Sequence, residues 1–84
     1  MNRKQRIDKI VSKKLKNFLI EVVDNSNLHK GHNNFTGQDE THIKIILTKK
    51  NNIAINRLNI HRIINKLLED EFTSGLHSLE IKIN

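Results

Sequence analysis

The pattern of apolar and polar residues predicts three β-strands. Apolar and polar residues alternate between Glu40 and Thr48 and again from Leu76 to Ile83, and residues 18–24 (FLIEVVD) form a short run rich in β-forming residues. A period of two directs every second side chain to the same face of a sheet. The sequence therefore predicts a sheet with one buried face and one polar face.

Two further stretches have the three- and four-residue spacing of amphipathic helices. The first helix is expected from Arg3 to Lys16, with Asn2 as its N-terminal cap. The second is expected to begin at Asn56 and to end just before Gly75. The apolar faces comprise Ile7, Ile10, Val11, Leu15 and Phe18 in the first helix and Ile60, Ile63, Ile64, Leu67 and Leu68 in the second.

The order of these elements is α-β-β-α-β, which predicts an α+β domain over residues 1–84 with a three-stranded mixed sheet packed against two main helices. The first two strands are expected to form an antiparallel hairpin, and the β-α-β crossover makes the third strand parallel to the second. The long polar loop of residues 25–39 then lies at the same end of the sheet as the starts of the second and third strands. Four histidines are expected at this end: His29, His32, His42 and His77. His61, early in the second helix, is expected nearer the opposite end.

The composition is that of a soluble globular chain, with 36% hydrophobic and 29% charged residues. No apolar run approaches the roughly 20 residues that span a bilayer, and the basic N-terminus lacks the apolar segment of a secretory signal. The expected location is the cytoplasm, with no membrane contact. The net charge of +6 indicates an acidic protein or a nucleic acid as partner, or else only the abundance of Lys in a chain also rich in Asn and Ile.

Catalysis by this chain is not expected. It contains no cysteine, and its serines occur in no setting typical of an activated nucleophile. The three consecutive acidic residues Glu69, Asp70 and Glu71 are typical of a solvated helix end. No glycine-rich phosphate loop is present.

Metal binding is compatible with the histidines. His29 and His32 are three residues apart in the loop, and His77 is expected at the first inward-facing position of the last strand. A closed zinc site requires four ligands, so a metal centre here would take its missing ligands from a partner. Imidazole replaces thiolate on one iron of some two-iron clusters, and a chain without cysteine can therefore share such a cluster with a thiol-bearing protein. Each histidine taken singly is also typical of an ordinary surface position.

Nucleic-acid binding is the competing hypothesis. A small sheet with basic flanks is similar to KH-type domains, although their GXXG loop is absent here. Lys49, Lys50 and Asn51, in the turn after the second strand, are candidates for phosphate contacts. The many basic residues of the first helix either attract such a partner or form a solvated face.

Three motifs give the chain a more specific resemblance. They are ETHIK (Glu40 to Lys44), LNIHRIINKLLEDE (Leu58 to Glu71) and LHSLEIKI (Leu76 to Ile83), with DNSNLH (Asp24 to His29) before the loop. In this order and spacing they resemble the BolA family, over about residues 20–83. The resemblance implies the α-β-β-α-β fold of the class II KH-like type.

The resemblance also implies a function. BolA-like proteins pair with monothiol glutaredoxins and share a [2Fe-2S] cluster, in cluster trafficking, assembly or iron regulation. Glutaredoxin and glutathione supply the thiolates, and the BolA-like protein supplies histidine, so no cofactor is expected on the chain alone, which is expected to be a monomer. By this resemblance His77 matches the C-terminal ligand, His29 matches the loop ligand with His32 as its alternative, and His61 with Arg62 matches a partner interface.

Some BolA-like proteins are described as transcriptional regulators that contact DNA, which keeps the second hypothesis open. Lys49, Lys50, Arg57 and Arg62 would form that surface. The family's F-x-G before the second helix is absent, with Asn52 and Ala54 at or near those positions.

Overall fold

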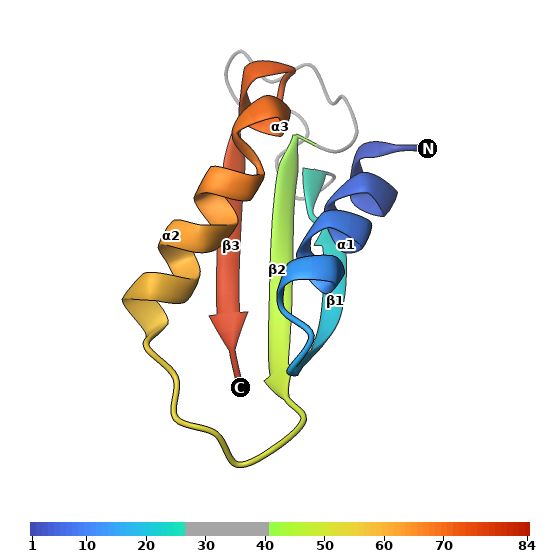
Figure 1. Ribbon diagram of the computed structural model, residues 1–84. Helices are drawn as coiled ribbons and strands as arrows, with labels where there is room; N and C mark the ends of the chain where they lie inside the picture. The colour runs from blue at the N-terminus through green and yellow to red at the C-terminus, as the bar shows by residue number, and fades with distance from the viewer. Residues whose placement is uncertain (27–40) are drawn as a thin grey trace.

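The computed structural model describes residues 1–26 and 41–84 of the chain. In chain order its elements are α1 (Arg3–Lys14), β1 (Phe18–Asp24), β2 (His42–Lys49), α2 (Arg57–Leu67), α3 (Glu69–Thr73) and β3 (Ser78–Ile83). Figure 1 shows α1 and α2 lying on the same face of one sheet. The predicted α+β order is confirmed, and the predicted second helix is divided at Leu68 into α2 and α3.

The sheet has the predicted topology, with β2 between its two neighbours. β1 pairs with β2 in the antiparallel sense, and Val22 lies opposite Ile45. β2 pairs with β3 in the parallel sense, and Ile45 lies opposite Ile81. The starts of β2 and β3 therefore lie side by side at one end of the sheet, and their carboxyl ends lie together at the other.

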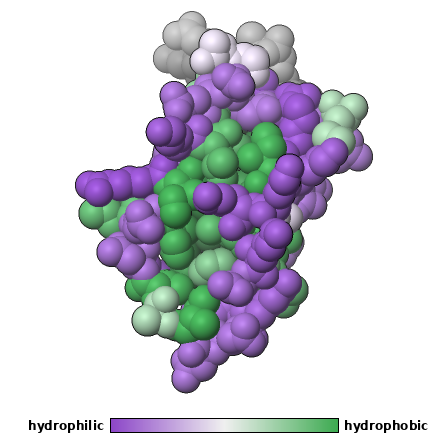
Figure 2. All heavy atoms as spheres, in the orientation of Figure 1, coloured by the Kyte–Doolittle hydropathy of each residue, from purple (hydrophilic) through white to green (hydrophobic). Residues whose placement is uncertain are grey.

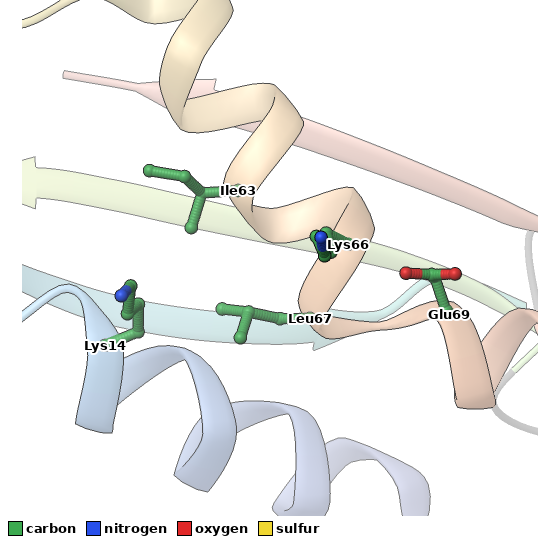
Figure 3. Close-up of a pocket in the computed structure, with 5 residues that line it drawn as sticks. All are labelled: Lys14, Ile63, Lys66, Leu67 and Glu69. Atoms are coloured by element: carbon green, nitrogen blue, oxygen red, sulfur yellow. The ribbon is translucent and has the colours of Figure 1, made fainter.

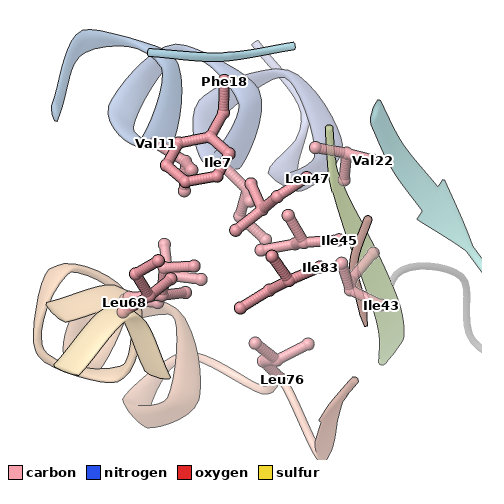
Figure 4. Packing of buried hydrophobic residues seen from close by; sticks show 12 residues of the cluster. Ile7, Val11, Phe18, Val22, Ile43, Ile45, Leu47, Leu68, Leu76 and Ile83 are labelled. Carbon is pink, nitrogen blue, oxygen red and sulfur yellow. The ribbon is translucent and has the colours of Figure 1, made fainter. Parts of the chain in front are cut away.

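Along β2, buried side chains alternate with partly exposed ones, so the sheet has one buried face and one face with both apolar and polar side chains. In β2 the side chains of Ile43, Ile45 and Leu47 are 0–2% exposed and face the helices, as Figure 4 shows. The opposite face includes Lys44, whose ammonium lies 3.4 Å from the Glu80 carboxylate. Within residues 1–26 and 41–84, the helices therefore cover one side of the sheet only, which is common for small sheets containing antiparallel strands.

Both main helices begin at a capping asparagine, Asn2 as predicted for α1 and Asn56 for α2. The Asn2 side chain accepts the amide of Gln5 at 2.8 Å, and the Gln5 side chain accepts the amide of Asn2 at 3.0 Å, which forms a capping box. The Asn56 side chain accepts the amide of Asn59 at 3.0 Å. The first helix ends at Lys14, two residues before the predicted Lys16.

The turn after α3 contains the predicted glycine. Gly75 has a φ of 127°, a conformation that side chains with a Cβ rarely adopt. This turn brings the chain back toward the sheet, where Leu76 is buried and β3 begins two residues later. Among the described residues, no helix has the length and apolar character needed to cross a membrane.

Candidate functional site

The starts of β2 and β3 are joined by backbone hydrogen bonds that bring two histidines together. The Thr41 carbonyl accepts the amide of His77 at 2.8 Å and that of Ser78 at 3.1 Å. His42 lies opposite Ser78 in the parallel pairing. The parallel register thus places His77 beside the start of β2, and we call this region the histidine end.

The imidazoles of His42 and His77 are close neighbours at the histidine end. Their ring centroids lie 6.1 Å apart, with the ring planes at 77°. His42 is half-buried, and its Nδ1 lies 3.0 Å from Oγ1 of Thr41, which orients the ring. His77 is exposed, and within residues 1–26 and 41–84 its ring makes no hydrogen bond to a side chain. An exposed imidazole in this position is accessible to a metal centre held by another protein.

The prediction that His77 faces inward is wrong. The structure begins β3 at Ser78, so His77 lies just outside the strand. The buried position at this end of the sheet is taken by Leu76, which is 3% exposed. His77 is consequently at the margin of the fold, where a partner can contact it.

A buried polar network fixes the start of β2. The Ser26 hydroxyl is nearly inaccessible and accepts the amides of Thr41 at 2.9 Å and His42 at 3.3 Å. It donates to Oδ1 of Asp24 at 2.5 Å. Asn25 also donates its amide to the His42 carbonyl at 2.8 Å. This network ties the end of β1 to the strand that presents His42.

In the sequence, only the polar run Asn25-Ser26-Asn27 points to this region, and it predicts no more than the end of a strand. The predicted topology places His42 at this end of the sheet but does not identify it as a ligand. The register of β2 against β3 makes it the described imidazole nearest to His77.

A buried carboxylate links α1 to the segment that leads to His77. Glu71 accepts Nε of Arg3 at 2.9 Å, and Arg6 donates Nε and Nη2 to its two oxygens at 2.8 and 2.9 Å. Nη2 of Arg3 also donates to the carbonyl of Ser74 at 2.9 Å. We call these residues the Glu71 cluster. The Glu71 carbonyl accepts the amide of Leu76 at 2.9 Å, so the cluster holds the turn immediately before His77.

The prediction of a solvated acidic helix end holds for Glu69 and Asp70, which are exposed, but is wrong for Glu71. The side chain of Glu71 is only 8% exposed. The hydrogen bonds from Arg6, opposed by burial but helped by those from Arg3 and by both positive charges, hold the pKa of Glu71 below its ordinary value. Arg3 and Arg6 are therefore structural, and only the rest of the basic face of α1 is available for another role.

The two predicted loop ligands, His29 and His32, lie outside the described residues. In the described part of the chain, no group of three or more His, Cys, Asp or Glu side chains is placed to hold a metal ion. The described residues therefore do not form a closed metal site of their own.

The residues predicted to contact nucleic acid gather mainly at the other end of the sheet. Lys49 ends β2, Lys50 follows it, and Arg57 begins α2. Nη1 of Arg57 donates to the carbonyl of Ile83 at 3.1 Å, which places it at the end of β3. Seven steps of about 3.3 Å along β2 separate this end from His42 by about 23 Å. The two hypotheses therefore involve different regions of the molecule.

The predicted partner-interface residues lie on α2. His61 is half-buried and Arg62 is exposed, both in the first half of the helix. Since α2 starts near the end of β3 and runs toward the histidine end (Figure 1), His61 lies toward the end away from His77, as predicted.

Comparisons with known proteins agree with this architecture. The family model described as "BolA-like protein" matches residues 11–84. The UV-induced protein uvi31 of Schizosaccharomyces pombe is 34% identical over 84 residues, which cover 96% of this chain and 82% of that protein. The chloroplastic protein BOLA1 of Arabidopsis thaliana is 33% identical over 82 residues, which cover 95% of this chain and 51% of that protein.

Solved structures show the same similarity. The BolA domain of SufE1 from Arabidopsis thaliana superimposes with a TM-score of 0.78 at 33% identity, covering the whole of this chain and 92% of that domain's chain. BolA1 from Arabidopsis thaliana superimposes with a TM-score of 0.79 at 29% identity, covering 99% and 90% of the two chains. Because the family model matches residues 11–84, which are most of the chain, the chain belongs to the BolA family.

Proposed function

We propose that this BolA-family chain is an adaptor without catalytic activity that pairs with a monothiol glutaredoxin and shares a [2Fe-2S] cluster with it. The cluster is its cargo, in iron–sulfur trafficking or assembly or in iron regulation. The observation that supports this proposal most directly is the exposed side chain of His77, whose backbone amide donates to the Thr41 carbonyl at the end of the sheet.

The ligand chemistry fits a shared centre. Histidine nitrogen is an accepted ligand of two-iron clusters, and the chain has no cysteine to supply thiolate. The thiolates would come from the glutaredoxin and from glutathione. His77 is the first candidate for an iron ligand, and by the family resemblance His29, or His32 in its place, is the second. His42, with its ring 6.1 Å from that of His77, is a further candidate for the second position.

The test is to mix the chain under anaerobic conditions with a cluster-loaded monothiol glutaredoxin and glutathione. Formation of the heterodimer should change the visible absorption and circular dichroism of the cluster, because one iron exchanges a ligand. His77→Ala should remove or alter that change, and His42→Ala tests the second position.

Ser78→Ala is the matched control, since Ser78 is adjacent, exposed and not a cluster ligand. It should give the wild-type spectrum. Failure to form a heterodimer, or identical spectra with His77→Ala and with the wild type, would refute His77 as a ligand.

A second candidate function, a nucleic-acid-binding regulator, is favoured by the exposed cations Lys50, Arg57 and Arg62. Such a surface predicts DNA binding that weakens with salt and still distinguishes sequences. Charge reversal at Lys50 and Arg62 should weaken that binding and leave the glutaredoxin spectrum unchanged. Binding with no sequence preference would indicate only a basic protein.

A further inference from the structure

An open groove lies between α1 and α2 on the helical side of the molecule. It consists of two adjoining hollows of about 560 and 330 Å³, which share Lys14 and Leu67 in their walls. We call this feature the helix groove. Its floor is formed by Ile10, Ile63 and Leu67, and its rim by Lys13, Lys14 and Lys66. Figure 3 shows Ile63 and Leu67 on α2 and Lys14 on the facing α1.

The floor of the helix groove is apolar and remains in contact with solvent. Ile10 and Leu67 pack against the buried core, yet both are only half-buried, as is Ile63. Figure 2 shows the resulting apolar strip running between polar margins on this face. Covering such side chains is favourable by about 25 cal/mol for each Å² removed from water, so the groove can bind a complementary apolar surface.

The rim of the helix groove is basic. Lys13, Lys14 and Lys66 are all exposed, and none of them forms an ion pair with an acidic side chain of the described residues. Glu69 is the single acidic residue among the described residues that line the two hollows. These lysines occupy the last turns of α1 and α2, where a positive charge stabilises the helix by interacting with its dipole. Helix stabilisation accounts for their position but not for the uncovered apolar floor between them.

We propose that the helix groove docks an acidic amphipathic helix of a partner protein. A helix that presents apolar residues at three- and four-residue spacing covers the floor, and carboxylates beside them pair with the lysines of the rim. A flat membrane surface fits less well, because the floor is recessed between two helices. Nucleic acid fits less well too, since the described lining has no aromatic side chain on which a base can stack.

This proposal does not depend on cluster binding. The helix groove lies on the covered face of the sheet, and neither His42 nor His77 lines it. The two can therefore be tested separately on the same folded chain.

In the experiment, a displayed library of random peptides of about 16 residues, some four helical turns, is selected for binding to the whole chain. We expect enrichment of sequences in which Asp or Glu flanks apolar residues at three- and four-residue spacing. An enriched peptide, synthesised and titrated into ¹⁵N-labelled protein, should shift the amide resonances of Ile10, Ile63 and Leu67. The double variant Lys14→Glu/Lys66→Glu should bind that peptide at least about tenfold more weakly, since two attractive charges become repulsive.

The matched control is Lys50→Glu/Lys82→Glu, which has the same net charge and reverses two exposed lysines outside the groove. It should bind within about twofold of the wild type, and far-UV circular dichroism should show both double variants folded. Equal weakening in both variants would reduce the effect to overall charge and overturn the proposal. It would also be overturned by no enrichment, by enrichment of basic or uncharged peptides, or by shifts elsewhere on the molecule. The proposal would also be overturned if no peptide bound and vesicles of anionic phospholipid bound in a way that depends on Lys14 and Lys66. The occupant of the groove would then be a lipid surface.

Discussion

Replacing Glu71 by Gln should destabilise the fold far more than an ordinary surface substitution. The carboxylate accepts three hydrogen bonds from two guanidinium groups, and Arg3 is only 11% exposed. A carboxamide has one acceptor oxygen, so its NH₂ group would face a guanidinium donor. The substitution would also remove the Glu71 counter-charge from the nearly buried guanidinium of Arg3.

Removing one partner of a buried ion pair costs about 3–5 kcal/mol. Arg6 is 39% exposed and can regain water, so we expect a cost below this range, about 2–3 kcal/mol. A chain of this length has a total stability of about 4–13 kcal/mol, and the loss is therefore a large fraction of it. With an m-value of about 1 kcal/mol/M in urea, the midpoint should fall by about 2–3 M.

The assay is urea unfolding followed by far-UV circular dichroism, because the chain contains neither Trp nor Tyr as a fluorescent reporter. Glu69→Gln is the matched control. Glu69 is exposed, lies two residues away and forms no ion pair with the described residues, so its substitution should change stability by less than about 0.5 kcal/mol. If Glu71→Gln and Glu69→Gln unfold at the same urea concentration, the Glu71 cluster does not stabilise the fold.

The pH dependence gives an independent check. Since the folded state lowers the pKa of Glu71 from the ordinary value of 4.5, its contribution is fully present above that value and is lost as the pH falls through the folded-state pKa. The stability gap between the wild type and Glu71→Gln should therefore be constant near neutrality and narrow below pH 4.5. A gap that stays constant into strong acid would show that the carboxylate charge is not the cause.

Two further substitutions test the core and the turn before His77, both by the same urea assay. Ile45→Ala, at a fully buried position of the central strand, should cost about 2–5 kcal/mol, whereas Ile46→Ala on the opposite face should cost clearly less; equal losses would contradict the assigned faces. Gly75→Ala should cost about 1–3 kcal/mol, because φ is 127° and the added Cβ would lie 3.4 Å from Nη2 of Arg3; an unchanged midpoint would refute the strain.

The fold was predictable from the sequence because its signals are local. The β-rich run from Phe18 to Asp24 predicts β1 with the bounds that the structure has. Asn2 caps the first helix as predicted, because its side chain accepts a backbone amide only three residues away. Chain connectivity then determined which ends of the strands meet, and this brought His42 and His77 together in the prediction.

The features that the sequence did not reveal depend on contacts between distant residues. Arg3 and Glu71 are 68 positions apart, and charged residues at the ends of two helices look solvated until the packing of those helices is known. The exposure of His77 depends on where the strand begins, and a shift of one or two residues at a strand end is below the precision of a periodic pattern. The role of Ser26 was not apparent for the same reason, since its hydroxyl accepts the amides of Thr41 and His42, 15 and 16 residues later in the chain.

The distribution of these features over the molecule bears on whether the two proposed partners can bind together. The exposed imidazole lies at one end of the sheet, the candidate phosphate contacts lie mainly at the other, and the helix groove occupies the face between α1 and α2. Neither His42 nor His77 lines the groove. Sites that share no residues and no hydrogen-bond network usually behave additively. We therefore expect a glutaredoxin and an acidic helix to bind the same chain together, which would let one small domain hold a cluster-bearing protein while a second protein is recruited to its helical face.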